Sequence, residues 1–255
     1  MDVRLKNTTQ KNKTKNMLDK YILEKANQIS YSQQERSNIA STLSYLKNIV
    51  NNEPDFREPF LGGSYKRGTM VKGISDVDVY FRYTGTGNSQ TALAKLKNSL
   101  TQTYPNSIIK QDKPSILADF NKIPINITPY KEDAYSNMSI PDRFLINWDY
   151  VKFGDLETNI TALRQKNPKL IELIKILKLW NKNYNKRIKN FEIEKKVCNL
   201  FLYSDSSSNS IADWIWTFFS NNGFQTDANK FFTLMKDNYS DAVLKSEWLL
   251  FIDNK

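Results

Sequence analysis

The sequence contains no histidine, and this absence excludes several classes of site. Zinc sites built on cysteine and histidine are excluded, as are serine or cysteine nucleophiles that depend on a histidine base. The single cysteine, Cys198, excludes an internal disulfide and is typical of a reducing compartment. Any proton acceptor in this protein must therefore be a carboxylate, a lysine, a tyrosine or water.

Long hydrophobic runs are also missing, because no stretch approaches eighteen apolar residues and the N-terminus has no apolar signal core. We therefore expect a cytoplasmic protein without membrane contact. The 255 residues are 40% hydrophobic and 13% aromatic, enough for a substantial core in one large or two modest domains. The net charge of +10 and the pI of about 9.4 favour an anionic partner such as a nucleoside triphosphate, RNA or DNA.

One segment, FLGGSYKRGTMVKGISDVDVYF at residues 60–81, contains the constellation that indicates chemistry. Asp76 and Asp78 alternate on a strand-like stretch, so both point to one face and can bind one cation. Mg²⁺ is a hard cation that takes oxygen ligands from a few carboxylates and from phosphates. Gly63 and Ser64 form a preceding turn whose backbone N–H groups and hydroxyl can hold a phosphate. The residues alone leave two alternatives: metal-assisted phosphate chemistry and a solvated edge hairpin.

These motifs resemble those of the polymerase-β superfamily of nucleotidyltransferases. The G-S turn, an R-G-T spacer and the S-D-x-D sequence are most similar to bacterial oligonucleotide cyclases (CD-NTases) related to cyclic GMP-AMP synthase and oligoadenylate synthase. Residues 32–51 resemble the long helix that precedes the G-S turn in that family. The sequence LIELIKILKLWN at residues 170–181 resembles its helix ending K-x-W-N, and IKNFEIE at residues 188–194 resembles its L-x-S-F/Y-x-x-E element.

The resemblance implies an α+β, two-lobed nucleotidyltransferase fold: a mixed β-sheet with helices, an N-terminal spine helix and a helical C-terminal lobe. Hydrophobic periodicity agrees, with helical spacing over residues 17–29 and 32–50, strand-like stretches before residue 131 and helical spacing from residue 148 onward. Residues 131–142 are expected to form a loop. We place a basic arm at residues 1–16, the catalytic core with the N-terminal helices at residues 17–147, and the helical lobe at residues 148–255.

One position departs from the family pattern. The family carries a third carboxylate on a later strand, in a pattern like I-D-x-x-P, where this chain has Asn126. An amide oxygen can contact Mg²⁺ but cannot accept a proton, so the metal that activates the attacking hydroxyl should bind more weakly. Three alternatives remain: a slow enzyme, a nucleotide-binding sensor or regulator without turnover, and a deliberate replacement of aspartate. We do not expect Asp119, on the preceding strand, to substitute, because the turn at Asn121 and Lys122 does not determine its facing.

The remaining implied contacts are to the nucleotide. Lys178 falls beside the apolar stripe of its helix, where a lysine is ordinarily a solvated charge, whereas the resemblance implies that it binds the triphosphate tail. Asn190 stands where the family commonly has serine and could keep a phosphate hydrogen bond through its amide. The full expectation is nucleotide binding by Gly63, Ser64, Lys178 and Asn190, Mg²⁺ or Mn²⁺ at Asp76 and Asp78, and a catalytic position at Asp76, Asp78 and Asn126.

The implied reaction is attack of a nucleotide hydroxyl on an α-phosphorus with loss of pyrophosphate. Its products would be linear or cyclic oligonucleotide second messengers, made from ATP, GTP or other nucleoside triphosphates in bacterial anti-phage signalling. A further alternative is an RNA or tRNA nucleotidyltransferase, because archaeal CCA-adding enzymes and poly(A)-type polymerases share the G-S and D-x-D signature. The basic composition favours that alternative, while the short chain and the absent tail domain disfavour it.

Overall fold

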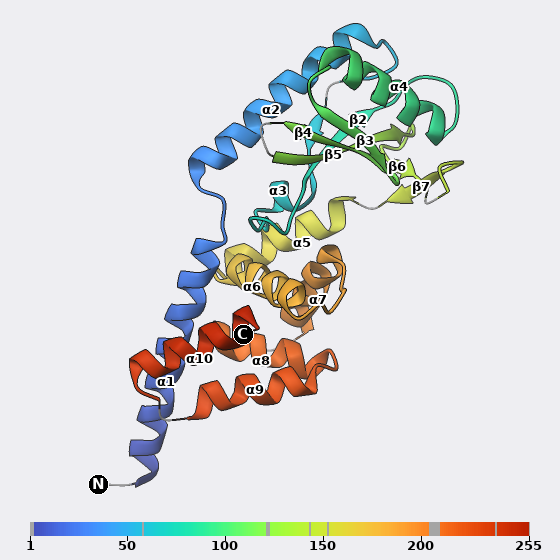
Figure 1. The fold of residues 1–255 in the computed structure, drawn as a ribbon. Coiled ribbons are helices and arrows are strands. Elements are labelled where there is room, and N and C mark those ends of the chain that lie inside the picture. Colours follow the sequence, from blue (N-terminus) through green and yellow to red (C-terminus); the bar gives the residue numbers. More distant parts are fainter. Residues whose placement is uncertain are drawn as a thin grey trace. The chain divides into compact units, whose positions relative to one another are not determined.

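The chain folds into two units (Figure 1). The computed structural model describes residues 3–57, 59–120, 123–142, 144–151, 153–203, 210–237 and 239–254. One unit, Tyr31–Thr158, contains the strands, and the other combines Met1–Ser30 with Asn159–Lys255 and is helical. We call these the sheet unit and the helical unit. This division differs from the predicted domains, because the first helix groups with the C-terminal helices rather than with the sheet.

The described strands of the sheet unit form a seven-stranded mixed sheet. Its order is β1-β2-β5-β4-β3, with β6 paired to β5 and β7 paired to β6. β2 and β5 run parallel, and the other pairs run antiparallel. The strands are β1 (Phe60–Leu61), β2 (Val77–Arg82), β3 (Ile108–Asp112), β4 (Ser115–Phe120), β5 (Ile123–Glu132), β6 (Met138–Pro141) and β7 (Trp148–Val151).

Alternating side chains give the sheet one face covered by helices and an opposite face, which we call the open face and on which Tyr80 and Thr128 are buried. The covered face packs against α2 (Gln33–Asn52) and α4 (Ser89–Thr103), whose apolar residues share one core with the strands. This core buries Val77, Val79, Ile116, Ala118, Ile125 and Ile127 of the sheet together with Ile39, Leu46, Leu93, Leu96 and Leu100 of the helices. The intervening residues of β2, β4 and β5 therefore lie on the opposite, open face.

The predicted helix over residues 32–50 is confirmed as α2, and its start is encoded locally. Ser32 is the N-cap: its Oγ accepts the Glu35 N–H at 3.2 Å, and its own N–H donates to Glu35 Oε2 at 2.6 Å. This reciprocal pair satisfies two backbone N–H groups that the first turn leaves without intrahelical partners. The carboxylate of Glu35 also pairs with Lys72 at 2.8 Å, and these contacts lower its pKa to about 2.

Two predictions for the end of the sheet are wrong. The predicted loop over residues 131–142 contains the end of β5 and all of β6, and β7 occupies the start of the predicted helical region. Asp133 explains the first difference, because its Oδ1 accepts the N–H groups of Tyr135 and Asn137 and folds the chain into a tight turn between β5 and β6. Pairing across this hairpin then outweighs the weak local pattern.

The helical unit contains α1 (Val3–Gln28), most of α5 (Phe153–Lys166), α6 (Leu170–Asn183), α7 (Asn190–Tyr203), α8 (Ile211–Asn221), α9 (Gln225–Lys236) and α10 (Asp241–Asp253). The predicted basic arm is thus part of α1 from Val3 onward. α1 packs on α6, α8, α9 and α10 around an aromatic core that includes Trp180, Phe219, Phe231 and Trp248. Among the described residues, no helix combines the length and apolar character needed to cross a bilayer.

Candidate functional site

Three predicted catalytic residues meet on the open face of the sheet. Asp78, the second residue of β2, lies opposite Asn126 of the parallel neighbour β5. Asp76 directly precedes β2, and its Oδ2 accepts a hydrogen bond from Asn126 Nδ2 at 3.1 Å. Asp76 is exposed, whereas Asp78 and Asn126 are partly buried. The chain therefore holds a carboxylate, an amide and a second carboxylate together at the start of two parallel strands.

Gly63 lies directly against Asp78 and opens the short helix α3 (Gly63–Arg67). Its φ is +58°, and a Cβ atom at this position would come within 1.7 Å of Asp78 Oδ2. The backbone N–H of Gly62 also donates to the carbonyl oxygen of Asp78 at 3.0 Å. Both the backbone conformation and the close approach require glycine. The predicted turn is therefore the first turn of a helix, in which Ser64 is buried.

The donor set of this site suits a hard cation. Mg²⁺ is usually held through one or two carboxylates, with phosphate oxygens and waters completing its coordination. Asp76 and Asp78 supply two carboxylates, and Asn126 adds an amide oxygen. Across the described part of the chain, no group of three or more His, Cys, Asp or Glu side chains is placed to hold a metal. A cation here would therefore depend on this pair of aspartates and on oxygen atoms of a bound nucleotide.

Two tyrosines near the aspartates have raised pKa values. Burial, followed by the charge of Asp78, raises the pKa of Tyr80 far above its ordinary value. Burial also raises the pKa of Tyr31, and the carboxylates of Glu35 and Asp76 add to this effect. Both hydroxyl groups therefore stay protonated at neutral pH, so neither tyrosine is suited to accept a proton.

Lys178 and Asn190 belong to the helical unit. Lys178 lies on α6 with its side chain fully buried, and its Nζ is 2.5 Å from Oε1 of the equally buried Glu194 on α7. The prediction that Lys178 falls off the buried side of its helix is wrong, because α6 is enclosed on nearly all sides. Asn190 is the first residue of α7 and is partly buried. Their contacts with a triphosphate stay a prediction, and in this structure Glu194 compensates the charge of Lys178.

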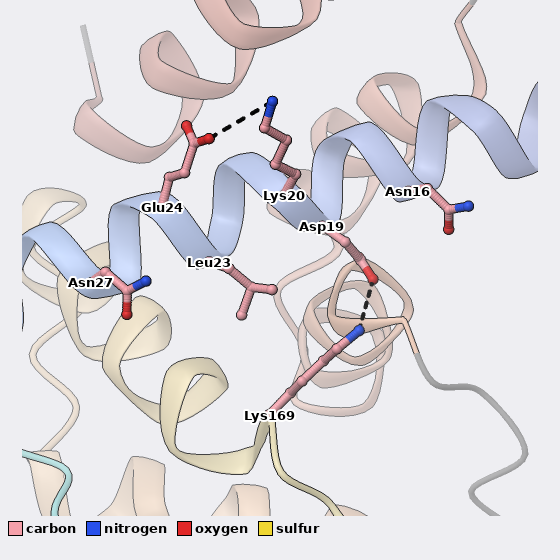
Figure 2. A pocket seen from close by; sticks show the side chains of 7 residues that line it. All are labelled: Asn16, Asp19, Lys20, Leu23, Glu24, Asn27 and Lys169. Atoms are coloured by element: carbon pink, nitrogen blue, oxygen red, sulfur yellow. Dashed lines mark hydrogen bonds and ion pairs between the residues drawn. The ribbon is translucent and has the colours of Figure 1, made fainter.

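A pocket of about 460 Å³ in the helical unit contains none of the predicted site residues (Figure 2). It is lined by Asn16, Asp19, Lys20, Leu23, Glu24, Asn27 and Lys169. Lys169 points to Asp19 and ends 3.3 Å from its Oδ2. Asp19 also accepts the backbone N–H groups of Ile211 and Ala212 at the start of α8. The buried carboxylate of this pocket therefore caps a helix and anchors α1, which is a structural role.

Sequence reasoning missed the facing of Asp119. Leu117 of β4 lies opposite Asn126, and Asp119 lies opposite Pro124, so all four residues are on the open face. The sequence left this facing undetermined, and the register of β4 against β5 determines it. The signal was the alternation along β4, where the apolar Ile116 and Ala118 belong to the covered face. Asn121 and Lys122, on which the expectation depended, lie outside the described residues.

Fold and site together define a class of protein. The mixed sheet carries Asp76 and Asp78 at the start of β2, beside Gly63 and beside Asn126 of the parallel strand β5. This arrangement is expected of a polymerase-β superfamily nucleotidyltransferase. The family model of the second messenger oligonucleotide or dinucleotide synthetase domain matches residues 17–167. This match spans more than half of the chain, and the chain therefore belongs to that family. No curated protein matches the sequence.

Solved structures share the fold. The structure of CdnC from E. coli MS115-1 with ATP superimposes with a TM-score of 0.75 at 14% identity, and the match covers 92% of this chain and 97% of that chain. CdnG from Bradyrhizobium diazoefficiens, a CD-NTase in complex with GTP, gives a TM-score of 0.66 at 10% identity and coverage of 93% and 90%. E. coli DncV in its 3′-deoxy GTP bound form gives 0.60 at 10% identity and coverage of 99% and 89%.

At these identities the structural likeness establishes the fold, and the family match establishes the class of enzyme. The predicted resemblance and the predicted α+β fold are both confirmed. The chain is a nucleotidyltransferase of the group that makes oligonucleotide second messengers.

Proposed function

We propose that this chain is a metal-dependent nucleotidyltransferase that joins nucleoside triphosphates into linear or cyclic oligonucleotides for anti-phage signalling. The observation that carries the proposal is the convergence of Asp76, Asp78 and Asn126 beside Gly63 on the open face of the sheet. The family supports an oligonucleotide product. The complexes of CdnC with ATP and of CdnG with GTP support nucleoside triphosphates as substrates.

Each residue of the site has a distinct part in this proposal. The first N–H groups of α3 have no intrahelical partner, so those at Gly63 and Ser64 are available for the donor phosphates. Asp76 and Asp78 would hold Mg²⁺ or Mn²⁺, which when bound stabilises the charge that develops on the transferred phosphoryl group. Asn126 orients Asp76 through its 3.1 Å hydrogen bond without adding the repulsion that a third carboxylate would bring.

The proposed reaction is an in-line displacement. A hydroxyl of the acceptor nucleotide attacks the α-phosphorus, and the bond to pyrophosphate breaks as the new P–O bond forms. Such a transfer depends mainly on holding donor and acceptor in register and on charge stabilisation. A Cβ atom added at Gly63 would come within 1.7 Å of Asp78 Oδ2, so this position leaves no room for a side chain beside the carboxylate.

A nucleotide sensor without turnover is the second candidate function. The observation that favours it is Asn126, because its amide donates to Asp76 and cannot accept the proton of an attacking hydroxyl. In that case Asp76, Asp78 and Gly63 would bind a nucleotide with its metal, and the bound state itself would be the signal.

Pyrophosphate release from a mixture of the four ribonucleoside triphosphates, with Mg²⁺ or Mn²⁺, separates these candidates. The chain itself is compared with Asn126→Asp and with the double variant Asp76→Ala/Asp78→Ala. We expect release by the chain, faster release by Asn126→Asp and none by the double variant. Nucleotide binding without release in the first two proteins would favour the sensor, and transfer of label to added RNA would instead indicate an RNA nucleotidyltransferase.

A further inference from the structure

The proposed transfer releases a proton from the acceptor hydroxyl, and a protein group placed to take it would act faster than water. Histidine is absent from the sequence. Asn126 carries an amide, which cannot take the proton, and the ring of Tyr80 is buried and stacked on Phe60. Asp76 and Asp78 are committed to the cation in the proposed function. A further carboxylate on the same face would complete the site.

Asp119 is a carboxylate in the right place. It lies on β4, directly across from Pro124 of β5, and is therefore the diagonal neighbour of Asn126 on the open face. Diagonal neighbours in an antiparallel pair are about 7 to 8 Å apart at Cα, close enough for one small group between them to contact both side chains. The Asp119 side chain is exposed, and it forms no salt bridge within the described residues.

The surroundings of Asp119 fit the sugar and base of a nucleotide. Ile108 of β3 lies directly opposite Asp119 and is 62% exposed, although it is a large apolar residue in a strand. Pro124 is exposed on the other side, and Leu117 is partly buried on the same face. An acceptor nucleotide placed here would cover this apolar surface while its hydroxyl reaches the space between Asp119 and Asn126.

We propose that Asp119 is the proton acceptor of the transfer reaction and replaces the carboxylate that Asn126 lacks. The inference rests on the proposed function. The O–H bond of the acceptor breaks, its proton goes to the Asp119 carboxylate, and the electron pair of the oxygen forms the bond to the α-phosphorus. The bond from that phosphorus to the bridging oxygen breaks at the same time, and its electron pair leaves with pyrophosphate.

This role differs from that of a third metal ligand. Asp119 lies on β4, Asp76 directly precedes β2, and β5 lies between these two strands. The backbones of the two aspartates are therefore separated by about twice the strand spacing of about 4.8 Å. The described residues accordingly include no group of three carboxylates that could hold one metal. Asp119 therefore acts on the acceptor nucleotide and not on the cation.

A cycle of variants tests the proposal through pyrophosphate release and product analysis. Asp119→Asn removes the acceptor and keeps the shape, Asn126→Asp restores a carboxylate on β5, and the third protein carries both changes. The matched control is Asp112→Asn, the same change on β3 at the opposite end of the β3–β4 pair. General base catalysis contributes about 10²- to 10⁴-fold, so kcat of Asp119→Asn should fall at least about 100-fold while Asp112→Asn keeps its rate.

The Asn126→Asp background provides the decisive readout. If Asp119 replaces the missing carboxylate, Asp119→Asn should cost less than about tenfold once residue 126 can accept the proton, because the two changes then act on one function. An equal loss in both backgrounds would indicate a merely structural role and overturn the proposal, as would full activity of Asp119→Asn. Circular dichroism of each variant confirms that it is folded.

Failure of this inference can be told from failure of the proposed function. If the parent chain is active, Asp76→Ala/Asp78→Ala is inactive and Asp119→Asn keeps the activity, the proposed function holds and the inference is overturned. Activity confined to Asn126→Asp also overturns it, because Asp119 then does not substitute. Inactivity of every variant, with nucleotide binding intact, contradicts turnover itself and the role of Asp119 with it.

Discussion

The two units of the molecule use charged residues in opposite ways. The sheet unit has 15 Lys and Arg against 14 Asp and Glu, a net charge of +1, whereas the helical unit has 22 against 13, a net charge of +9. Yet five of the six buried charged side chains in the described residues belong to the helical unit. These five are Asp19, Lys175, Lys178, Glu194 and Asp227, and the sixth is Asp142.

The charges of the helical unit fasten helices to one another. Lys15 and Lys25 of α1 pair with Asp213 of α8 and Asp253 of α10 at 2.8 and 2.7 Å. In the sheet unit the core is apolar, and Asp76 and Asp119 remain on the open face. The comparison indicates two uses of charged side chains: those buried between helices stabilise the fold, and those on the open face of the sheet are available for chemistry. The positive excess of the helical unit is the part of the composition that favours an anionic partner.

The largest effect expected in the sheet unit follows from the close fit around Asp78. In Gly63→Ala the added methyl group would collide with the Asp78 carboxylate at 1.7 Å, and the residue would also be strained at φ +58°. A displaced carboxylate should reduce pyrophosphate release by about 100-fold or more, as a shift of about 1 Å in a catalytic group can. Steady-state kinetics measure the loss.

Gly68→Ala is the matched control for this variant. Gly68 also has a positive φ, of +73°, at the end of α3, but a Cβ atom there would meet no atom within 4 Å. It should lose stability by about 1 kcal/mol and keep most of its activity. Equal activity losses in both variants would mean that backbone strain matters and contact with Asp78 does not, and the close fit would then have no functional meaning.

Much of this site could be predicted from the sequence because its signals are local. Alternation along β2 places Asp76 and Asp78 on one face, and the capping box at Ser32 marks the start of α2. The resemblance to the cyclase family located Gly63 and Asn126 before any pairing was known. These features depend on residues close in sequence or on motifs whose order is distinctive.

The features that could not be predicted depend on tertiary pairing. Alternation along β4 indicates only the face on which Asp119 lies, whereas its position beside Asn126 follows from the register between β4 and β5, which the ambiguous turn does not determine. The pairing of Lys178 with Glu194 depends on how α6 packs on α7. α1 joins the helical unit through residues more than 140 positions away, such as Lys169, and no local signal carries that information.

The largest stability effect expected in the helical unit lies at the buried pair. Glu194→Gln leaves the Lys178 ammonium buried without its counter-ion, which should lower the free energy of unfolding by about 3 to 5 kcal/mol. The double variant Lys178→Met/Glu194→Leu should lose much less, because apolar side chains of similar size leave no buried charge. Urea unfolding monitored by tryptophan fluorescence measures both.

The surface pair Lys20–Glu24, with side chains 66% and 42% exposed, provides the control. Glu24→Gln should change the free energy of unfolding by less than about 1 kcal/mol. A loss at Glu194 no larger than that would contradict the structural use of buried charge. The double variant also tests the predicted contact of Lys178 with the triphosphate, since a folded protein without this lysine should show a raised KM for ATP if the contact exists.

The smallest effect is a pH dependence at Tyr21 of α1. Tyr21 donates to Asp241 Oδ1 at 2.5 Å, and this hydrogen bond, together with burial and the charges of Asp241 and Glu24, raises its pKa from 10.0 to about 12. The folded protein thus holds this proton more tightly than the unfolded chain. The resulting stabilisation is complete below pH 10 and is lost as the pH rises from 10 to about 12.

Tyr21→Phe should therefore flatten part of the alkaline decline in the free energy of unfolding between pH 10 and about 12. Lysine titration affects the variant and the parent chain alike, so the difference between their curves isolates Tyr21. The exposed Tyr45 offers a matched control, and Tyr45→Phe should leave the curve unchanged. Parallel curves for Tyr21→Phe and the parent chain would show that the hydrogen bond from Tyr21 to Asp241 does not stabilise the fold. The contrast between structural charge in the helices and available charge on the sheet would then rest on the pairs of Lys15 and Lys25 without this tyrosine.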